Sequence, residues 1–154
     1  MKLLVANIML TSSLLAFNDA QDRVLKIAKN MGTQHGLSYT LMAIVWKESS
    51  CGLHRANYIS GCYGVGHIRL RTYMDRHHIP YTFENQQEAM RLLSNVDTVN
   101  LREALVELKY WKKIHKGNTT RAIASYFAGT KWWLGIEYAK DIKKKRNQLK
   151  RKGY

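Results

Sequence analysis

The sequence runs LMAIVWKESSCG from Leu41 to Gly52, and the other segments of the chain can be interpreted by their relation to it. Five apolar residues open it, and Glu48 follows shortly before small polar residues and a glycine. The pattern predicts a buried helix that meets a loop just after Glu48. Burial and the negative end of the helix dipole both disfavour a charged carboxylate there. A glutamic acid that keeps its proton near neutral pH can act as a general acid.

The composition narrows the class of protein. The 154 residues carry a formal charge of +14, are 45% hydrophobic and include a single proline. Such a chain can bury a sizeable core and is not a disordered protein. The excess of cations predicts a polyanionic partner: nucleic acid, an anionic membrane or an acidic cell-wall polymer. Many of the cations lie in residues 140–154, which form either a solvated basic helix end or a tether to a polyanion.

Residues 1–16 have the pattern of an export signal. Lys2 supplies a basic start, residues 3–16 are apolar or small, and Ala16 offers a cleavage position. The alternative is a buried N-terminal helix. If the segment is a signal, residues 17–154 form one mature domain that works in the periplasm or cell wall. The apolar run is short for a membrane span, so we expect no stable membrane insertion after cleavage.

The two cysteines, Cys51 and Cys62, allow several interpretations. An even count in an exported protein favours one disulfide, which would close a short loop just after Glu48. Two free thiols are the alternative. A metal site formed with His54 and His67 lacks standard ligand spacing, so we expect no metal and no cofactor.

Helical spacing recurs along the chain, and no long segment alternates as a strand does. The predicted class is mainly α, with at most a minimal β-hairpin in the glycine-rich loop 49–66. Asp19, Ser38 and Thr82 are predicted N-caps. Residues 129–135 are predicted to form a loop. The predicted helices cover about residues 20–31, 39–48, 67–76, 83–93, 98–115, 119–128 and 136–149.

Three later places could form a site with Glu48. The glycines of Gly64-Val65-Gly66-His67-Ile68 allow close backbone approach to a ligand. Ser125-Tyr126-Phe127-Ala128-Gly129 puts a tyrosine at the end of an apolar helix, and Tyr138 follows in the last helix. Each pattern alone is common in structural roles, because a glutamate at a helix end is usually solvent-exposed and a tyrosine on an apolar face is usually core.

In this order and spacing the motifs resemble those of the soluble lytic transglycosylases, the lysozyme-like SLT family. Tyr39 to Ser49 resembles the catalytic motif of that family. Gly64 to Ile68 is similar to its glycine-x-(methionine or glycine)-glutamine-(isoleucine or leucine) motif, and Ser125 to Gly129 to its alanine-tyrosine-asparagine-alanine-glycine motif. Tyr138 matches a late tyrosine. The resemblance covers roughly residues 24–142 and implies a single lysozyme-like, goose-type-like α domain with a cleft for a glycan strand.

The resemblance also implies a reaction, in which one glutamate cleaves the β-1,4 bond between N-acetylmuramic acid and N-acetylglucosamine. Glu48 would protonate the glycosidic oxygen and then take the proton of the C6 hydroxyl that attacks C1, leaving a 1,6-anhydro end. By the same resemblance, Tyr126 would orient the Glu48 carboxyl, and Tyr138 would help to hold that group or the substrate. The other substrate positions implied are Ser49, beside the sugar, and Gly66, His67 and Ile68, in the floor of the subsite.

Aromatic residues offer further sugar contacts. Trp132, Trp133 and Tyr63 are candidates to stack on sugar faces, with core or rim packing as the alternative. Two residues depart from the family pattern. His67 replaces a glutamine and can also become charged near neutral pH. Phe127 replaces an asparagine and removes a polar contact.

A one-acid mechanism fits a chain with only 11 acidic residues. Ordinary glycosidases need a second carboxylate, and the nearest candidates, Asp75, Glu84 and Glu88, lie in no motif. The sequence therefore predicts an exported, monomeric lytic transglycosylase that binds peptidoglycan, such as a phage endolysin or a wall-remodelling enzyme. A muramidase of the same bond and a non-catalytic peptidoglycan-binding module are alternatives. A nucleic-acid-binding protein is indicated by charge alone, and the export pattern argues against it.

Overall fold

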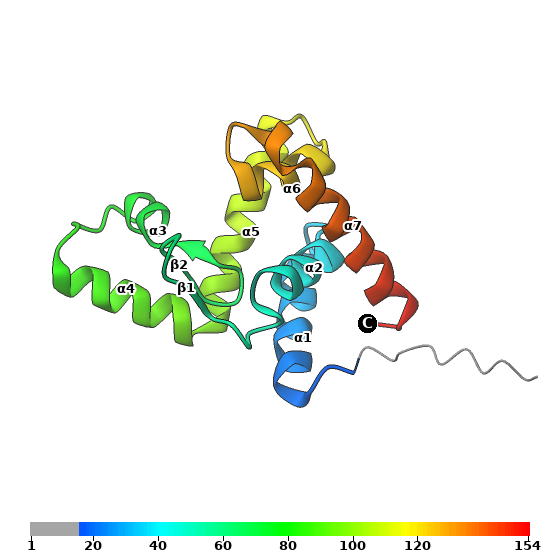
Figure 1. Cartoon of the computed structure of the whole chain (residues 1–154), viewed down its shortest axis with the longest axis horizontal. Helices are drawn as coiled ribbons and strands as arrows, with labels where there is room; N and C mark the ends of the chain where they lie inside the picture. Colours follow the sequence, from blue (N-terminus) through cyan, green and yellow to red (C-terminus); the bar gives the residue numbers. More distant parts are fainter. Residues whose placement is uncertain (1–15) are drawn as a thin grey trace, which may run out of the picture.

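The computed structural model describes residues 16–154, which form a mainly helical unit with one small sheet (Figure 1). The mainly α class is confirmed. The export signal expected over residues 1–16 lies outside the described residues, apart from Ala16. No helix within residues 16–154 has the length and apolar character needed to cross a membrane. The helices are α1 (Asp19–Thr33), α2 (Ser38–Ser49), α3 (Leu70–Arg76), α4 (Phe83–Asn95), α5 (Asp97–Ile114), α6 (Thr119–Ala128) and α7 (Ile136–Arg151), with a 3-10 helix η1 (Trp132–Gly135) before α7.

The middle of helix α2 is buried on all sides because residues 41–45 are all apolar. The side chains of residues 41–45 have no solvent exposure, and α2 packs against α1 and α7. The chain leaves the helix through Ser50 and Cys51, which both have left-handed backbone angles, with φ of 51° and 57°. Their N–H groups bond to the carbonyl groups of Trp46 and Val45, closing the helix end. Glu48 therefore lies in the last turn of a buried helix, as predicted.

The sheet is antiparallel and minimal, formed by β1 (Ala56–Asn57), β2 (Cys62–Tyr63) and β3 (Ile68–Arg69), with β2 in the middle. The helix predicted over residues 67–76 begins later, at Leu70, because residues 68–69 pair with β2. The turn between β2 and β3 contains Gly64, at φ of 81°. A Cβ atom there would lie 2.0 Å from the Leu93 carbonyl oxygen, so only glycine fits this close approach.

Helix α5 runs through the middle of the molecule, from α4 at one end to α6 at the other (Figure 1). Its buried face includes Asn100, whose side chain has no solvent exposure. The Asn100 amide accepts a hydrogen bond from the Gly66 N–H at 2.7 Å and donates to the Tyr63 carbonyl at 2.7 Å. Asn100 thus fixes the β2–β3 turn to α5. Apolar residues at helical spacing predict an inner face for this helix, and all of them are buried: Leu101, Ala104, Leu105, Leu108 and Trp111.

Several predicted boundaries are wrong by a residue or two. Asn18, not Asp19, caps α1, in a reciprocal pair of hydrogen bonds with Gln21. Ser38 is the first residue of α2 and does not cap it, whereas Thr82 caps α4 as predicted. The predicted loop 129–135 contains η1, because Gly135 packs directly onto the backbone of α6.

Candidate active site

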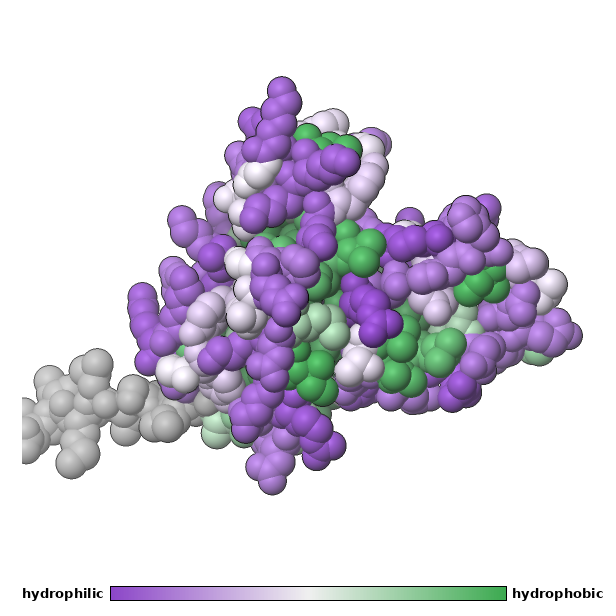
Figure 2. Space-filling view, turned by 180° about the vertical axis from the view of Figure 1, so that it is seen from behind, coloured by the Kyte–Doolittle hydropathy of each residue, from purple (hydrophilic) through white to green (hydrophobic). Residues whose placement is uncertain are grey.

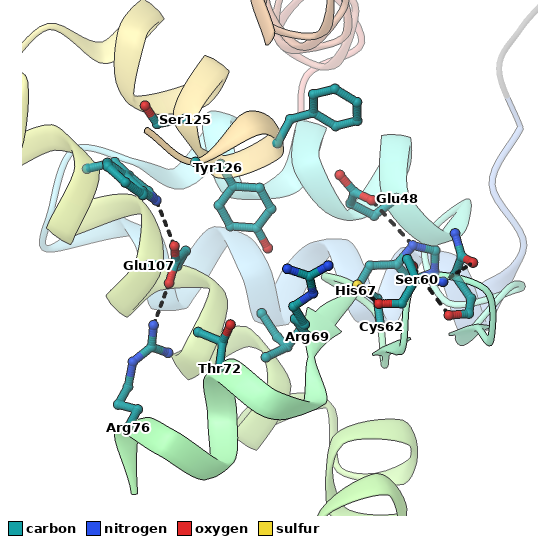
Figure 3. A pocket seen from close by; sticks show the side chains of 15 residues that line it. Glu48, Ser60, Cys62, His67, Arg69, Thr72, Arg76, Glu107, Ser125 and Tyr126 are labelled. Atoms are coloured by element: carbon teal, nitrogen blue, oxygen red, sulfur yellow. Dashed lines mark hydrogen bonds and ion pairs between the residues drawn. The ribbon is translucent and has the colours of Figure 1, made fainter. Parts of the chain in front are cut away.

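A cleft of about 570 Å³ opens beside Glu48 (Figure 3). Its walls come from the end of α2, the sheet, α3, α5 and α6. These segments are far apart in the sequence, and three of the four predicted motifs line the cleft. The fourth, Tyr138, contacts Glu48 without lining the cleft itself. The surface around the domain is mostly hydrophilic on the face that Figure 2 shows, in keeping with the net charge of +14.

The Glu48 carboxyl is held from two sides. The Tyr138 hydroxyl, from α7, donates a hydrogen bond to Oε1. The Nδ1 atom of His67 lies 3.3 Å from Oε2. The Glu48 and His67 side chains keep 18% and 13% of their surface exposed. Because both carboxyl oxygens have a partner, the orientation of the group is fixed before a ligand enters.

The ring of His67 is fixed by its second nitrogen. Nε2 lies 2.8 Å from the His54 carbonyl oxygen, which can only accept, so Nε2 carries a hydrogen. In a neutral ring Nδ1 then has only a lone pair, and its contact with Glu48 needs a proton that either residue can hold. Burial lowers the pKa of His67, but the hydrogen bonds with Glu48 and His54 outweigh this effect and the pKa is raised. A proton shared between Nδ1 of His67 and Oε2 of Glu48 would satisfy this geometry.

The backbone of His67 is strained. Its φ is 49°, in the left-handed region that a residue with a side chain adopts at a cost of about 1–3 kcal/mol. The His67 N–H bonds to the Gly64 carbonyl at 3.2 Å, within the turn that Asn100 holds. The surrounding structure thus places the imidazole ring against Glu48 despite the strain.

The two tyrosines have roles different from those expected. Tyr138, not Tyr126, contacts Glu48, while the Tyr126 hydroxyl donates to the Gly66 carbonyl at 2.7 Å. Burial raises the pKa of both tyrosines well above 10, and the charge of Glu48 acts in the same direction. Both hydroxyls therefore stay protonated and act as donors. The expected role of Tyr126 as the residue that orients Glu48 is wrong, because its hydroxyl is used by the Gly66 backbone.

Two other expected substrate contacts lie outside the cleft. Ser49 is fully buried, and its hydroxyl donates to the Val65 carbonyl at 2.7 Å, which ties the end of α2 to the β2–β3 turn. Gly66 is buried as well, with both backbone polar groups bonded to Asn100 and Tyr126. His67 and Ile68 do line the cleft, as predicted.

The cysteines form no disulfide and are free thiols. Cys51 lies in the core, where burial raises its pKa to about 12. Cys62 lines the cleft instead, with its sulfur 3.7 Å from the Ser60 carbonyl oxygen. The alternation of strand β2 explains the separation, since it directs Tyr63 into the core and Cys62 to the opposite face.

The aromatic residues of the cleft are not the ones expected. Tyr63 is core, and neither Trp132 nor Trp133 lines the cleft, so the stacking role expected for the three is not supported. The Arg121 guanidinium lies over the Trp132 ring, with its carbon 4.5 Å from the ring centroid. Trp133 is 57% exposed. The aromatic residues that do line the cleft are Trp111, Tyr126 and Phe127.

Phe127 covers the Glu48 contact. Its ring stacks on that of Tyr138, with centroids 5.0 Å apart and an angle of 15° between the planes. Phe127 is 61% exposed and lines the cleft. It therefore offers an apolar face to a ligand where the SLT pattern has an asparagine.

The cleft also contains a carboxylate that sequence reasoning missed, Glu107 of α5. The Arg76 guanidinium donates to it from α3, and the Trp111 indole N–H donates to its other oxygen at 2.6 Å. Arg76 also contacts Glu103 at 2.6 Å, and Glu103 is 5% exposed. The spacing of four between Glu103, Glu107 and Trp111 was the available signal, since it puts them on one helix face. The candidates Asp75, Glu84 and Glu88 are exposed and lie outside the cleft.

Comparison with known proteins finds a relative whose activity has not been characterized. No protein-family model matches the chain, and no solved structure matches it. The chain is 33% identical over 133 residues to a protein of Enterobacteria phage T4, described as an uncharacterized 20.7 kDa protein in the vs-regB intergenic region. The similarity covers 85% of this chain and 72% of the phage T4 protein.

Proposed function

The chain belongs to the family of this uncharacterized phage T4 protein, and we propose that it is a peptidoglycan lytic transglycosylase with a lysozyme-like fold. The observation that carries the proposal is the Glu48 carboxyl, held by Tyr138 and His67 beside an open cleft. The resemblance of the sequence motifs to the SLT family supports it. So does the architecture, in which helices and one short antiparallel sheet line the cleft.

In the proposed reaction Glu48 is the acid and then the base. Its carboxyl gives a proton to the glycosidic oxygen as the bond from C1 to that oxygen breaks. The resulting carboxylate takes the proton of the muramyl C6 hydroxyl as that oxygen bonds to C1. One proton is given and one is taken, so no water is consumed and the product has a 1,6-anhydro end.

The position of Glu107 favours this reaction over hydrolysis. A hydrolase needs a second carboxylate that is free to attack C1 or to activate water. Glu107 is instead bound by the Arg76 cation at one oxygen and by the Trp111 indole N–H at the other. A carboxylate paired directly with an arginine is less available to attack C1 or to take a proton, and no arginine or lysine pairs with Glu48 among residues 16–154.

In the proposed mechanism, His67 and Glu48 exchange one proton across their contact. With the shared proton on Nδ1 the pair is an imidazolium and a carboxylate, and with the proton on Glu48 both groups are neutral. A sugar that fills the cleft displaces water and favours the neutral pair, because two charges lose more hydration than two neutral groups. Once Glu48 has given its proton away, the Nδ1 lone pair faces the carboxylate. The repulsion makes Glu48 a stronger base for the C6 hydroxyl.

The proposed setting is the periplasm or cell wall, as a phage endolysin or a wall-remodelling enzyme. It depends on the export pattern of residues 1–16. The proposed partner is the glycan strand of peptidoglycan, and the charge of +14 favours approach to an anionic polymer. The proposed reaction uses no cofactor, because Glu48 performs both proton transfers.

Digestion of purified sacculi tests the proposal, with the products identified by mass spectrometry. Wild-type protein is expected to release 1,6-anhydro ends and Glu48→Gln none. Glu84→Gln is the matched control, because Glu84 is exposed on α4 and lies outside the cleft. Reducing ends, heavier by one water, would contradict the transglycosylase reaction and indicate a muramidase. Binding of sacculi without cleavage would indicate the non-catalytic module.

A further inference from the structure

Two arginines line the cleft, and they differ in their partners. Arg76 pairs with two carboxylates, Glu103 and Glu107. Arg69, at the end of β3, has no hydrogen bond or ion pair from its guanidinium to any of residues 16–154. The cleft therefore has one arginine that no carboxylate in the described part of the chain contacts.

The sheet fixes where Arg69 points. Its backbone pairs with Cys62 of β2, which also lines the cleft. The Arg69 side chain is exposed and extends into the open space between Tyr126 and His67 (Figure 3). Thr72, one turn later in the same segment, lines the same wall and adds a hydroxyl.

A cation without a direct partner in this cleft would hinder the general acid catalysis proposed for Glu48. A positive charge near a carboxyl group favours the ionised form of that group, and an ionised Glu48 cannot act as a general acid. An anion on the ligand that paired with Arg69 would remove this effect as the ligand bound. The cleft is thus built for a substrate that carries its own negative charge.

We propose that Arg69, with Thr72 beside it, forms a subsite for a carboxylate carried by the muramyl residue of the glycan strand. The proposal rests on the function proposed above and names the feature of the substrate that is recognised. The muramyl residue differs from its neighbour by a lactyl group. Its carboxyl is free in a strand without peptides and is linked to a peptide, which has carboxylates of its own, in an intact strand. A guanidinium suits this ligand because its planar fork offers two parallel N–H donors to one carboxylate.

Arg71 provides a matched control. It lies two residues further along, is equally exposed to solvent, and is outside the cleft. Its guanidinium lies 3.8 Å from the Asp75 carboxylate and 5.6 Å from the centroid of the Tyr81 ring. Replacing either arginine with glutamine removes one unit of charge, so a loss that came from general electrostatic attraction to the strand would appear in both variants.

The test is calorimetric binding in a Glu48→Gln background, which prevents turnover. Three soluble glycan probes are compared: strands with peptides, strands stripped of peptides so that lactyl carboxylates are free, and stripped strands with those carboxylates converted to methyl amides. Arg69→Gln is expected to weaken binding of the recognised charged strand about tenfold, the scale of a charged hydrogen bond. Binding of the amide strand is expected to stay unchanged, and Arg71→Gln to leave all three unchanged.

The pattern of losses identifies the source of the carboxylate. A loss on stripped strands indicates the lactyl group, and a loss confined to strands with peptides indicates a peptide carboxylate. An equal loss on the amide strand, or no loss on either charged strand, overturns the subsite. If the wild-type protein cleaves sacculi but Arg69→Gln binds every probe as tightly as its parent, only the subsite is overturned. No cleavage and no binding of any probe removes the proposed function as well.

Discussion

The Nδ1 atom of His67 lies 3.3 Å from Oε2 of Glu48, while the other ring nitrogen is held by the His54 carbonyl. The SLT pattern has a glutamine where this chain has His67. A glutamine side chain can hydrogen-bond to a carboxyl group but cannot exchange a proton with it. The chain therefore departs from the family that it resembles at the atoms closest to its acid, and the departure adds a titrating group.

The pH dependence of cleavage is expected to follow the Glu48–His67 pair. The pKa of His67 is raised from its ordinary 6.5, so the pair keeps its shared proton at neutral pH and loses it as the pH rises through the raised value. Activity is expected to be present below that value and lost above it. In His67→Gln the ring that titrates near neutral pH is absent, so the loss is expected at a lower pH. The measurement is kcat/KM for solubilisation of sacculi across the pH range.

Other titratable or charged groups lie around this pair. Tyr138 and Tyr126 approach from α7 and α6, and their raised pKa keeps them neutral. Cys62 and Arg69 belong to the neighbouring strands. His35→Gln, a change of an exposed histidine away from the cleft, is the control and is expected to keep the wild-type profile. Superimposable profiles for wild type and His67→Gln would exclude the shared proton.

Removing the hydroxyl of Tyr138 is expected to affect mainly kcat, and removing that of Tyr126 mainly the free energy of unfolding. Tyr138→Phe removes the donor to Glu48 and is expected to lower kcat about 10- to 100-fold, with little change in KM, since bonds to charged groups are strong. Tyr126→Phe removes the bond to the Gly66 carbonyl and is expected to lower the free energy of unfolding by about 1 kcal/mol, with a smaller effect on kcat. Steady-state kinetics and urea unfolding of both variants measure the contrast. Equal losses of kcat would contradict the assigned roles.

The sequence predicted those parts of the fold that depend on local pattern. The apolar run 41–45 predicted a buried helix with Glu48 at its end, and the spacing along 98–115 predicted the inner face of α5. The order of the motifs predicted that His67 and Tyr138 lie near Glu48. These features follow from periodicity and from helix termination, which a sequence shows directly.

The parts that it missed depend on packing between distant segments. Which tyrosine reaches Glu48 is decided by the relative positions of α6 and α7, and nothing in either helix shows them. Glu107 of α5 lines the cleft together with Arg76 of α3, and no local pattern in either helix shows that these two meet. The disulfide prediction treated Cys51 and Cys62 as close in sequence, whereas the end of α2 turns one inward and strand β2 turns the other outward.

Gly64 is expected to tolerate no side chain. It has φ of 81°, and a Cβ atom would lie 2.0 Å from both the Leu93 carbonyl oxygen and the Asn100 side-chain nitrogen. Gly61 has a similar φ of 65° but nothing within 4 Å of the corresponding position. Gly61→Ala therefore measures backbone strain alone, about 1 kcal/mol. Gly64→Ala is expected to lose about 3 kcal/mol more, because α5 and the turn must separate. Urea unfolding compares them, and similar losses would show that the contact with Asn100 is dispensable.

The last prediction concerns Arg76, which joins α3 to two glutamates of α5. Glu103 is 5% exposed, so removal of the cation leaves a buried carboxylate whose remaining partner is His77, at 2.8 Å. Arg76→Met is expected to lower the free energy of unfolding by about 3–5 kcal/mol, the usual result of breaking a buried pair from one side. Arg91→Met is the control, since the Arg91–Glu88 pair is exposed and contributes at most about 1 kcal/mol.

A second change separates stranded charge from lost packing. Adding Glu103→Gln to Arg76→Met removes the unbalanced charge while keeping the shape of the side chain, so much of the lost stability is expected to return. Thermal unfolding of the wild type, Arg76→Met and the double variant measures this recovery. A double variant as unstable as Arg76→Met would mean that Arg76 stabilises the cleft through its packing on α5 and not through its charge.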